Sequence, residues 1–247
     1  MPIDLTYALV VFFAFLIAGT LKGAVGMGLP PTAVALASLF LPLQEALALM
    51  TVPTLLTNIW QAFWGGHLHS LVRRFWPMAL AIFVGCAVSA LGIRALGSPI
   101  ANGILGLLLV AFAVIALLAW QPRLPRRFEI WCNPLIGFLT GVVGGITGIA
   151  AIPFLPYMQS LEMERNELVQ ALGLLFICFT IAVSGALLDA GAFTIHSTAG
   201  ALYATIPTVA GLWLGQKLRQ VISAELFRRI FLLVLLGLGL NMARSLL

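Results

Sequence analysis

Two glycine-rich stretches in apolar surroundings are the part of this sequence best suited to bind a ligand. Residues 19–28 and residues 141–150 match at an offset of 122 residues, nearly half of the 247-residue chain. Prolines follow both stretches, at Pro30 and Pro31 and again at Pro153. Gly- and Pro-interrupted apolar segments at corresponding positions of two halves indicate the substrate site of a secondary transporter.

An unwound backbone at membrane depth survives only where it lines a cavity or is buried in protein, because hydrocarbon offers no hydrogen bonds. The glycines that supply such a backbone are Gly23, Gly26, Gly28, Gly145 and Gly148. Beyond each break, a helix beginning at Pro31 or Pro153 would present N–H groups and the positive end of its dipole to an anion. Close helix packing through small residues is the alternative explanation of the glycines. It does not account for the prolines.

Lys22 adjoins the first break and is the only lysine before residue 217. A cation inside a membrane is expensive, so its presence there is a functional hypothesis. Together with the following helix start, Lys22 would bind a small anion in a dehydrated site. The alternative is a lysine that reaches a membrane interface through its aliphatic stem. Gly144 occupies the matching position of the second half.

Four polar residues share one face of an apolar segment. Thr51, Thr54, Asn58 and Gln61 recur at i, i+3, i+7 and i+10, which aligns them on one side of a helix. This pattern predicts a wall of a substrate pathway, with interhelical hydrogen bonding as the alternative. Thr147, inside the second break, adds a hydroxyl. The first half is therefore expected to bind the anion's charge, and the second to supply backbone N–H groups and Thr147.

Other chemistries find less support. The three histidines and three cysteines lack the spacing of a metal site, so neither a metal nor a cofactor is predicted. A nucleophile with its base is also missing, which disfavours an intramembrane enzyme. Glu45 and Glu167 pair in the repeat at helix starts, where the dipole favours acids. Asp189 remains as the candidate for proton coupling.

Composition places the chain in the bilayer. It is 62% hydrophobic and 9% charged, with a mean hydropathy of +1.10, far from the make-up of a soluble domain. The net charge of +5 comes from basic residues in short loops, so it reports membrane topology rather than nucleic-acid binding. The N-terminus has no positive region before its apolar stretch, so the first helix is expected to be part of the mature protein.

Apolar runs between Gly, Pro and charged residues predict five helical segments in each half. The predicted segments are 5–22, 30–43, 46–64, 75–96, 100–120, 133–147, 149–160, 168–188, 198–216 and 226–246. The second segment of each half is too short to cross about 30 Å of hydrocarbon comfortably. The first two segments of each half are therefore expected to form a hairpin or a partly re-entrant pair.

An odd number of crossings in each half would reverse the second half in the membrane. Under this count only Arg94 and Arg244 fall on one side, and the other loop Lys and Arg residues fall on the opposite side. Because cytoplasmic loops are rich in Lys and Arg, both termini are expected outside. Residues 1–122 and 123–247 are predicted to be inverted repeats within one membrane domain. If a short segment crosses in only one half, the orientation changes.

The motifs together resemble the TauE/SafE family of sulfite-exporter-like permeases, over essentially the whole chain. The resemblance rests on residues 21–28 (LKGAVGMG), on Val52-Pro53 to Thr57-Asn58, and on the second break with Pro153. It implies two related membrane halves that move small, usually sulfur-containing, organic or inorganic anions. By position it points to Lys22, Gly23, Gly26, Gly28, Asn58, Gly145, Thr147, Gly148 and Pro153. Ala150 departs from the pattern, since the first break has Gly28 there.

The sequence thus predicts an all-α, multi-pass protein of the inner cell membrane and not an enzyme. We expect a secondary transporter, acting as an exporter, that moves sulfite, an organosulfonate or a related anion by alternating access between two inverted repeats. Thr54 and Gln61 complete the predicted substrate-binding set. A passive anion channel and, less favoured, an intramembrane enzyme are the alternatives. The exact substrate, the direction, the coupling ion and the oligomeric state, including a homo-oligomer, stay open.

Overall fold

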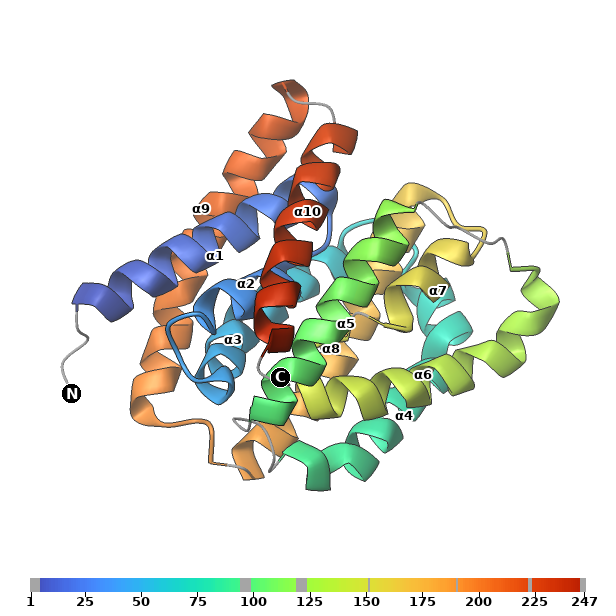
Figure 1. Cartoon of the computed structure of the whole chain (residues 1–247). Coiled ribbons are helices and arrows are strands. Elements are labelled where there is room, and N and C mark those ends of the chain that lie inside the picture. The colour runs from blue at the N-terminus through green and yellow to red at the C-terminus, as the bar shows by residue number, and fades with distance from the viewer. Residues whose placement is uncertain are drawn as a thin grey trace. The chain divides into compact units, whose positions relative to one another are not determined.

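A computed structural model of the chain describes residues 5–93, 99–118, 124–150, 152–189, 191–221 and 224–244. Ten α-helices and a short 3₁₀ turn form this part of the chain, and it contains no β-strand (Figure 1). The helices are α1 (Leu5–Val25), α2 (Leu29–Ala37), α3 (Leu43–Phe63), α4 (Leu68–Ile93), α5 (Pro99–Leu117), α6 (Glu129–Thr147), α7 (Phe154–Ser160), α8 (Arg165–Asp189), α9 (Ile195–Val221) and α10 (Ala224–Ala243). The predicted all-α fold is confirmed.

Each helix overlaps one of the ten predicted segments, because apolar runs broken by Gly, Pro and charges are a local signal. Arg94, Arg123 and the predicted segment ends at 96, 120 and 246 lie outside the described residues. α3 and α8 begin 122 residues apart, at Leu43 and Arg165. Each half therefore begins with a long helix, a short helix and another long helix, in that order.

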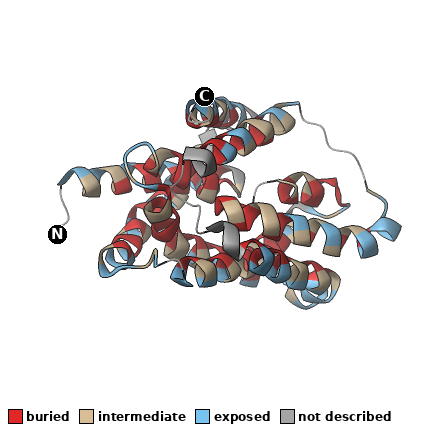
Figure 2. Ribbon diagram, turned by 60° about the horizontal axis from the view of Figure 1, so that its bottom comes forward, coloured by how far each residue is buried: buried red, intermediate tan, exposed pale blue. Residues whose placement is uncertain are grey.

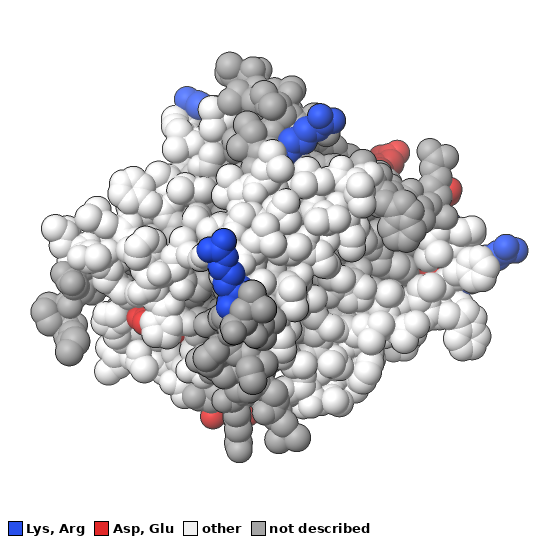
Figure 3. Space-filling view, in the orientation of Figure 1, with Lys and Arg blue, Asp and Glu red and all other residues white. Residues whose placement is uncertain are grey.

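Five of the described helices are long and apolar enough to cross a membrane. These spans are Leu5–Ala24, Leu43–Phe63, Leu68–Ser89, Arg126–Thr147 and Asn166–Asp189. Large apolar side chains are exposed, such as Trp60 and Trp131 at 65% and 76%. Exposed residues lie along many of the helices (Figure 2). The face shown in Figure 3 has few charges on a surface that is otherwise uncharged. Such a surface suits lipid rather than water, as expected for a polytopic membrane protein.

α2 and α7 are shorter than the segments predicted at 30–43 and 149–160. They have 9 and 7 residues, which corresponds to about 14 and 11 Å at 1.5 Å per residue. α2 ends at Ala37, and the hydroxyl of its C-cap residue Ser38 donates to the Ala35 carbonyl oxygen at 3.3 Å. Neither helix by itself is long enough to cross about 30 Å of hydrocarbon.

The helices group into two compact units that differ from the two halves of the sequence. Unit 1 comprises residues 1–54, 97–117 and 191–247, and unit 2 comprises residues 55–96 and 118–190. Each unit thus combines helices from both halves, with α1 against α9 in unit 1 and α4 against α6 in unit 2. The division into repeats 1–122 and 123–247 stays a prediction about internal repetition, and its boundary falls outside the described residues.

Glycines bring the backbones of α1 and α9 into direct contact in unit 1. A Cβ atom added at Gly19 would overlap the carbonyl oxygen of Thr208, and one at Gly23 would overlap that of Leu212. From the other side, a Cβ at Gly211 would overlap the carbonyl oxygen of Leu16. Small residues allow this close approach of membrane helices.

The contact of α4 with α6 in unit 2 repeats this arrangement. A Cβ at Gly141 would overlap the carbonyl oxygen of Ile82, and one at Gly85 would overlap that of Phe138. Gly141 follows Gly19 by 122 residues, whereas Thr208 follows Ile82 by 126. The two interfaces are therefore equivalent, and the four extra residues are accounted for by α8, which has 25 residues against 21 in α3.

These contacts predict that a single methyl group destabilises either interface. Gly141→Ala should lower the stability by about 1–3 kcal/mol, because the added Cβ has backbone atoms of α4 in its place. Gly185→Ala is the matched control, since a Cβ there meets nothing within 4 Å and alanine favours a helix. Thermal unfolding in detergent measures both. A melting temperature of Gly141→Ala equal to that of Gly185→Ala would contradict the interface.

Candidate functional site

The first break is a left-handed turn between α1 and α2. Gly26 has φ 89° and Gly28 has φ 99°, values that glycine adopts without steric cost. The Gly26 N–H donates to the Lys22 carbonyl oxygen at 2.7 Å, and Gly28 is the N-cap of α2. The predicted break is present, and it is made by these two glycines.

The second break repeats the turn 122 residues later. Gly148 has φ 75°, and its N–H donates to the Gly144 carbonyl oxygen at 2.6 Å. Pro153 is the N-cap of α7, so it lies one residue before the helix rather than in its first turn as predicted. Both halves therefore end their first helix with the same left-handed residue and the same hydrogen bond.

Lys22 lies in the last turn of α1, four residues before Gly26. It is 5% exposed, so its side chain does not extend to the protein surface as the alternative explanation requires. Its carbonyl oxygen accepts the hydrogen bond that closes the turn. The structure thus combines a buried cation and a left-handed break in one turn of unit 1.

Gly23 and Gly145 have a packing function that explains them without a ligand. Gly23 touches the backbone of α9, and a Cβ at Gly145 would overlap the Ser89 hydroxyl of α4. The signal was in the sequence, because Gly23 and Gly145 each follow another glycine by four residues, the spacing of small-residue helix contacts. The breaks depend on Gly26, Gly28 and Gly148 instead.

The helix starts offer fewer N–H donors than the sequence suggested. Pro30 and Pro31 have no N–H, so Leu29 alone supplies one among the first three residues of α2. The next N–H, of Thr32, donates to the Gly28 carbonyl oxygen at 3.2 Å. α7 has only 7 residues, so its dipole is weak. The groups that could still attract an anion are the Lys22 ammonium and the positive end of the α2 dipole.

Thr147 closes the second break from the side of α6. Its hydroxyl donates to the Val143 carbonyl oxygen at 2.8 Å and accepts from the Ile149 N–H at 3.4 Å. The side chain is 1% exposed. Thr147 therefore stabilises the end of α6, a function that the sequence did not reveal.

The polar face of α3 points into the protein. Thr54 and Asn58 are 2% and 1% exposed, and Thr51 and Gln61 are half-buried. Leu56 and Trp60, on the opposite face, are exposed. The predicted alignment on one buried face is present, as expected for a helix that turns its apolar side to lipid.

The predicted site residues divide between the two units. Unit 1 contains Lys22, Gly23, Gly26, Gly28 and Thr54. Unit 2 contains Asn58, Gln61, Gly145, Thr147, Gly148 and Pro153. Within each unit, the residues next to a break lie together in one turn.

The match to a known protein family covers both breaks and nearly all the helices. The sequence profile described as sulfite exporter TauE/SafE matches residues 11–242. The chain belongs to the sulfite exporter TauE/SafE family. No curated protein and no solved structure matches it. The family identifies this multi-pass chain as a membrane permease for sulfur-containing anions, and its being a family of transporters agrees with the prediction that the chain is not an enzyme.

This TauE/SafE protein also has a partly buried ionic network at the starts of α4, α6 and α8. Arg74 Nε and Nη2 donate to the Glu129 carboxylate, each at 2.8 Å, and Nη1 donates to Glu167 at 3.2 Å. Asn133 donates to the Arg74 carbonyl oxygen at 3.3 Å and accepts from the Tyr157 hydroxyl at 2.6 Å. The sequence showed Arg74 only as a loop charge, because its partners lie far along the chain.

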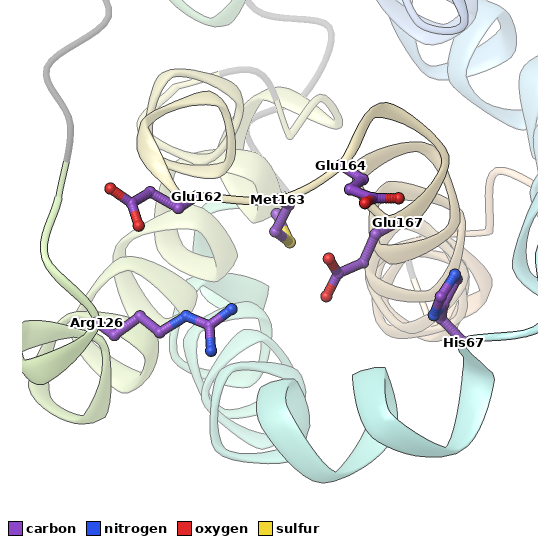
Figure 4. Close-up of a pocket in the computed structure, with 6 residues that line it drawn as sticks. All are labelled: His67, Arg126, Glu162, Met163, Glu164 and Glu167. Carbon is purple, nitrogen blue, oxygen red and sulfur yellow. The ribbon is translucent and has the colours of Figure 1, made fainter.

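A pocket of about 570 Å³ opens beside this network (Figure 4). Its lining residues are His67, Arg126, Glu162, Met163, Glu164 and Glu167. Three carboxylates and one arginine are among its lining residues, a balance that disfavours an anion. Among the described residues no three His, Cys, Asp or Glu side chains are grouped to bind a metal ion. We assign no part in anion transport to this pocket.

The network predicts a large effect of removing Arg74. Arg74→Met should destabilise the TauE/SafE protein by about 3–5 kcal/mol, because the Glu129 carboxylate, 9% exposed, loses its partner. Arg73→Met is the control, since Arg73 is exposed, and should change stability by less than about 0.5 kcal/mol.

Adding Glu129→Gln to Arg74→Met should recover part of the loss, because the buried group is then neutral. Denaturation in detergent measures all three variants. Equal stability of Arg74→Met and Arg73→Met would show that the network does not stabilise unit 2.

Proposed function

We propose that this TauE/SafE protein is a secondary transporter of the inner cell membrane that exports sulfite, an organosulfonate or a related small anion. The observation that supports this best is the buried Lys22 in the turn that ends at Gly26. Family membership limits the solute to sulfur-containing anions as a class. In this proposal such an anion binds at Lys22 and the first break.

Lys22 supplies the charge in this proposal. At 5% exposure its ammonium group is little screened by water or salt, so its attraction to an anion is stronger than at a surface. The N-terminus of α2, after Gly28, adds the positive end of a helix dipole. A tetrahedral or pyramidal oxyanion suits such a site because its charge is compact.

Alternating access between two inverted repeats is the proposed mechanism. The repeated turns at Gly26 and Gly148 and the equivalent glycine contacts support internal repetition of the fold. Inversion is inferred from the distribution of Lys and Arg in the loops. In transporters of this kind, substrate sites lie at discontinuous helices of the repeats.

The binding proposal predicts that Lys22→Met abolishes anion-dependent stabilisation of the purified protein. Thermal-shift measurements with sulfite, thiosulfate, sulfoacetate and taurine should show an increase in melting temperature for the wild type with at least one anion. Asn58→Ala should reduce that increase. Lys217→Met is the matched control, because Lys217 is an exposed cation over the Trp213 ring, and should respond like the wild type.

Two outcomes would contradict the proposal. Equal stabilisation of the wild type and Lys22→Met would remove Lys22 from the site, and no stabilisation by any anion would remove the site. Proteoliposomes that contain the protein then separate the mechanisms. A transporter gives saturable flux and exchange of labelled anion against unlabelled anion, whereas flux without saturation or exchange would identify a passive channel.

The inverted arrangement predicts that both chain termini lie outside the cell. Cysteines introduced next to Asp4 and Leu247 should react with a membrane-impermeant maleimide in intact cells, after the native Cys86, Cys132 and Cys178 are replaced by serine. A cysteine beside Arg127 should react only after the cells are opened. Protection at either terminus in intact cells would refute the inversion.

A further inference from the structure

A second polar cluster joins the starts of α1, α3 and α9 in unit 1. His196 Nδ1 lies 3.4 Å from Glu45 Oε1, and the ring centroids of His196 and Tyr7 are 4.6 Å apart. The His196 and Glu45 side chains are 34% and 26% exposed, so protons can reach them from water.

Local structure fixes the position of His196. The Thr194 hydroxyl accepts from the Ser197 N–H at 3.0 Å, and the Ser197 hydroxyl accepts from the Thr194 N–H at 2.8 Å. These reciprocal bonds cap the start of α9, and His196 lies between their two residues. A positive charge in the first turn of a helix opposes its dipole. The Glu45 carboxylate is therefore needed to stabilise a charged imidazole there.

The two ionic clusters are related by the internal repeat. Tyr7 precedes Glu129 by 122 residues, and Glu45 precedes Glu167 by the same number. Counted within each half of the chain, both clusters use the starts of the first helix (α1 or α6) and of the third helix (α3 or α8). Each adds a basic group from a fourth helix, α9 or α4. Their basic groups differ, since unit 2 uses Arg74 and unit 1 uses His196.

The place of the basic group also differs by one helical turn. In the glycine contacts α9 matches α4 at 126 residues, so Gly200 is the counterpart of Arg74. A Cβ at Gly200 would lie 2.5 Å from the Tyr7 hydroxyl oxygen. The Tyr7 side chain therefore fills the space that Arg74 uses in unit 2, and His196 supplies the basic group from one turn earlier.

This exchange changes the response to protons. Arginine keeps its charge at every physiological pH, so the network around Arg74 does not depend on protonation of its basic group. Histidine gains and loses its charge between about pH 5 and 8. Among the described residues, the titratable groups that face His196 are Glu45 from α3 and Tyr7 from α1.

We propose that the Tyr7, Glu45 and His196 cluster is a proton-binding site of this protein. A proton from water adds to the unprotonated ring nitrogen of neutral His196. This converts the contact with Glu45 into an ion pair. The ion pair holds the starts of α3 and α9 together in unit 1. Its formation on acidification, and its loss as the pH rises, make this end of unit 1 responsive to pH.

The test is the pH dependence of stability in the full chain. The melting temperature of the wild type should exceed that of His196→Gln by about 2 °C at pH 5.5, and the difference should vanish at pH 8. The sign follows from the charge, because the ion pair exists only while the imidazole is protonated. In a Glu45→Gln background, the effect of His196→Gln on the melting temperature should be the same at pH 5.5 and pH 8.

Two further variants make the result specific. His196→Arg should keep the ion pair at both pH values, so its melting temperature relative to His196→Gln should not change with pH. His69→Gln is the matched control, since His69 is exposed, and should show no pH-dependent difference from the wild type. The proposal is overturned if the difference between wild type and His196→Gln is the same at both pH values. It is equally overturned if Glu45→Gln retains that pH dependence.

Discussion

Direct backbone contact between helices from different halves of the chain is the constraint on which this structure depends. In lipid, apolar side chains gain little by leaving one apolar environment for another, so close packing supplies much of the association. Glycines at positions 19 and 141 place a carbonyl oxygen of the neighbouring helix where a Cβ would otherwise be. Each unit therefore forms around one long glycine contact, α1 with α9 or α4 with α6.

The position of the breaks follows from that contact. Gly23 packs against α9, and three residues later Gly26 leaves the helix with a positive φ. Helix packing thus holds α1 in place up to the residue where its backbone turns. Lys22, next to Gly23, is buried. Gly145 and Gly148 repeat this order in unit 2, where no lysine is present beside the break.

Three carboxylates of this protein lie where helices begin. A carboxylate in a first turn is favoured by the helix dipole, and Glu45, Glu129 and Glu167 are all in first turns. Each has a basic partner from the fourth helix of one half of the chain, either Arg74 on α4 or His196 on α9. One repeated geometry therefore supports a cluster whose basic group is an arginine and another whose basic group is a histidine.

The sequence by itself determined the features that depend on neighbouring residues. Apolar runs and their punctuation gave the ten helices, and the glycine and proline spacing located both breaks and indicated the family. It did not separate Gly23, which packs, from Gly26, which turns, because the difference depends on Leu212, far along the chain. The partners of Arg74, Glu129 and Glu167, were hidden for the same reason, because they lie 55 and 93 residues along the chain. Only the tertiary structure decides such pairs, since distant residues meet through packing that no local pattern encodes.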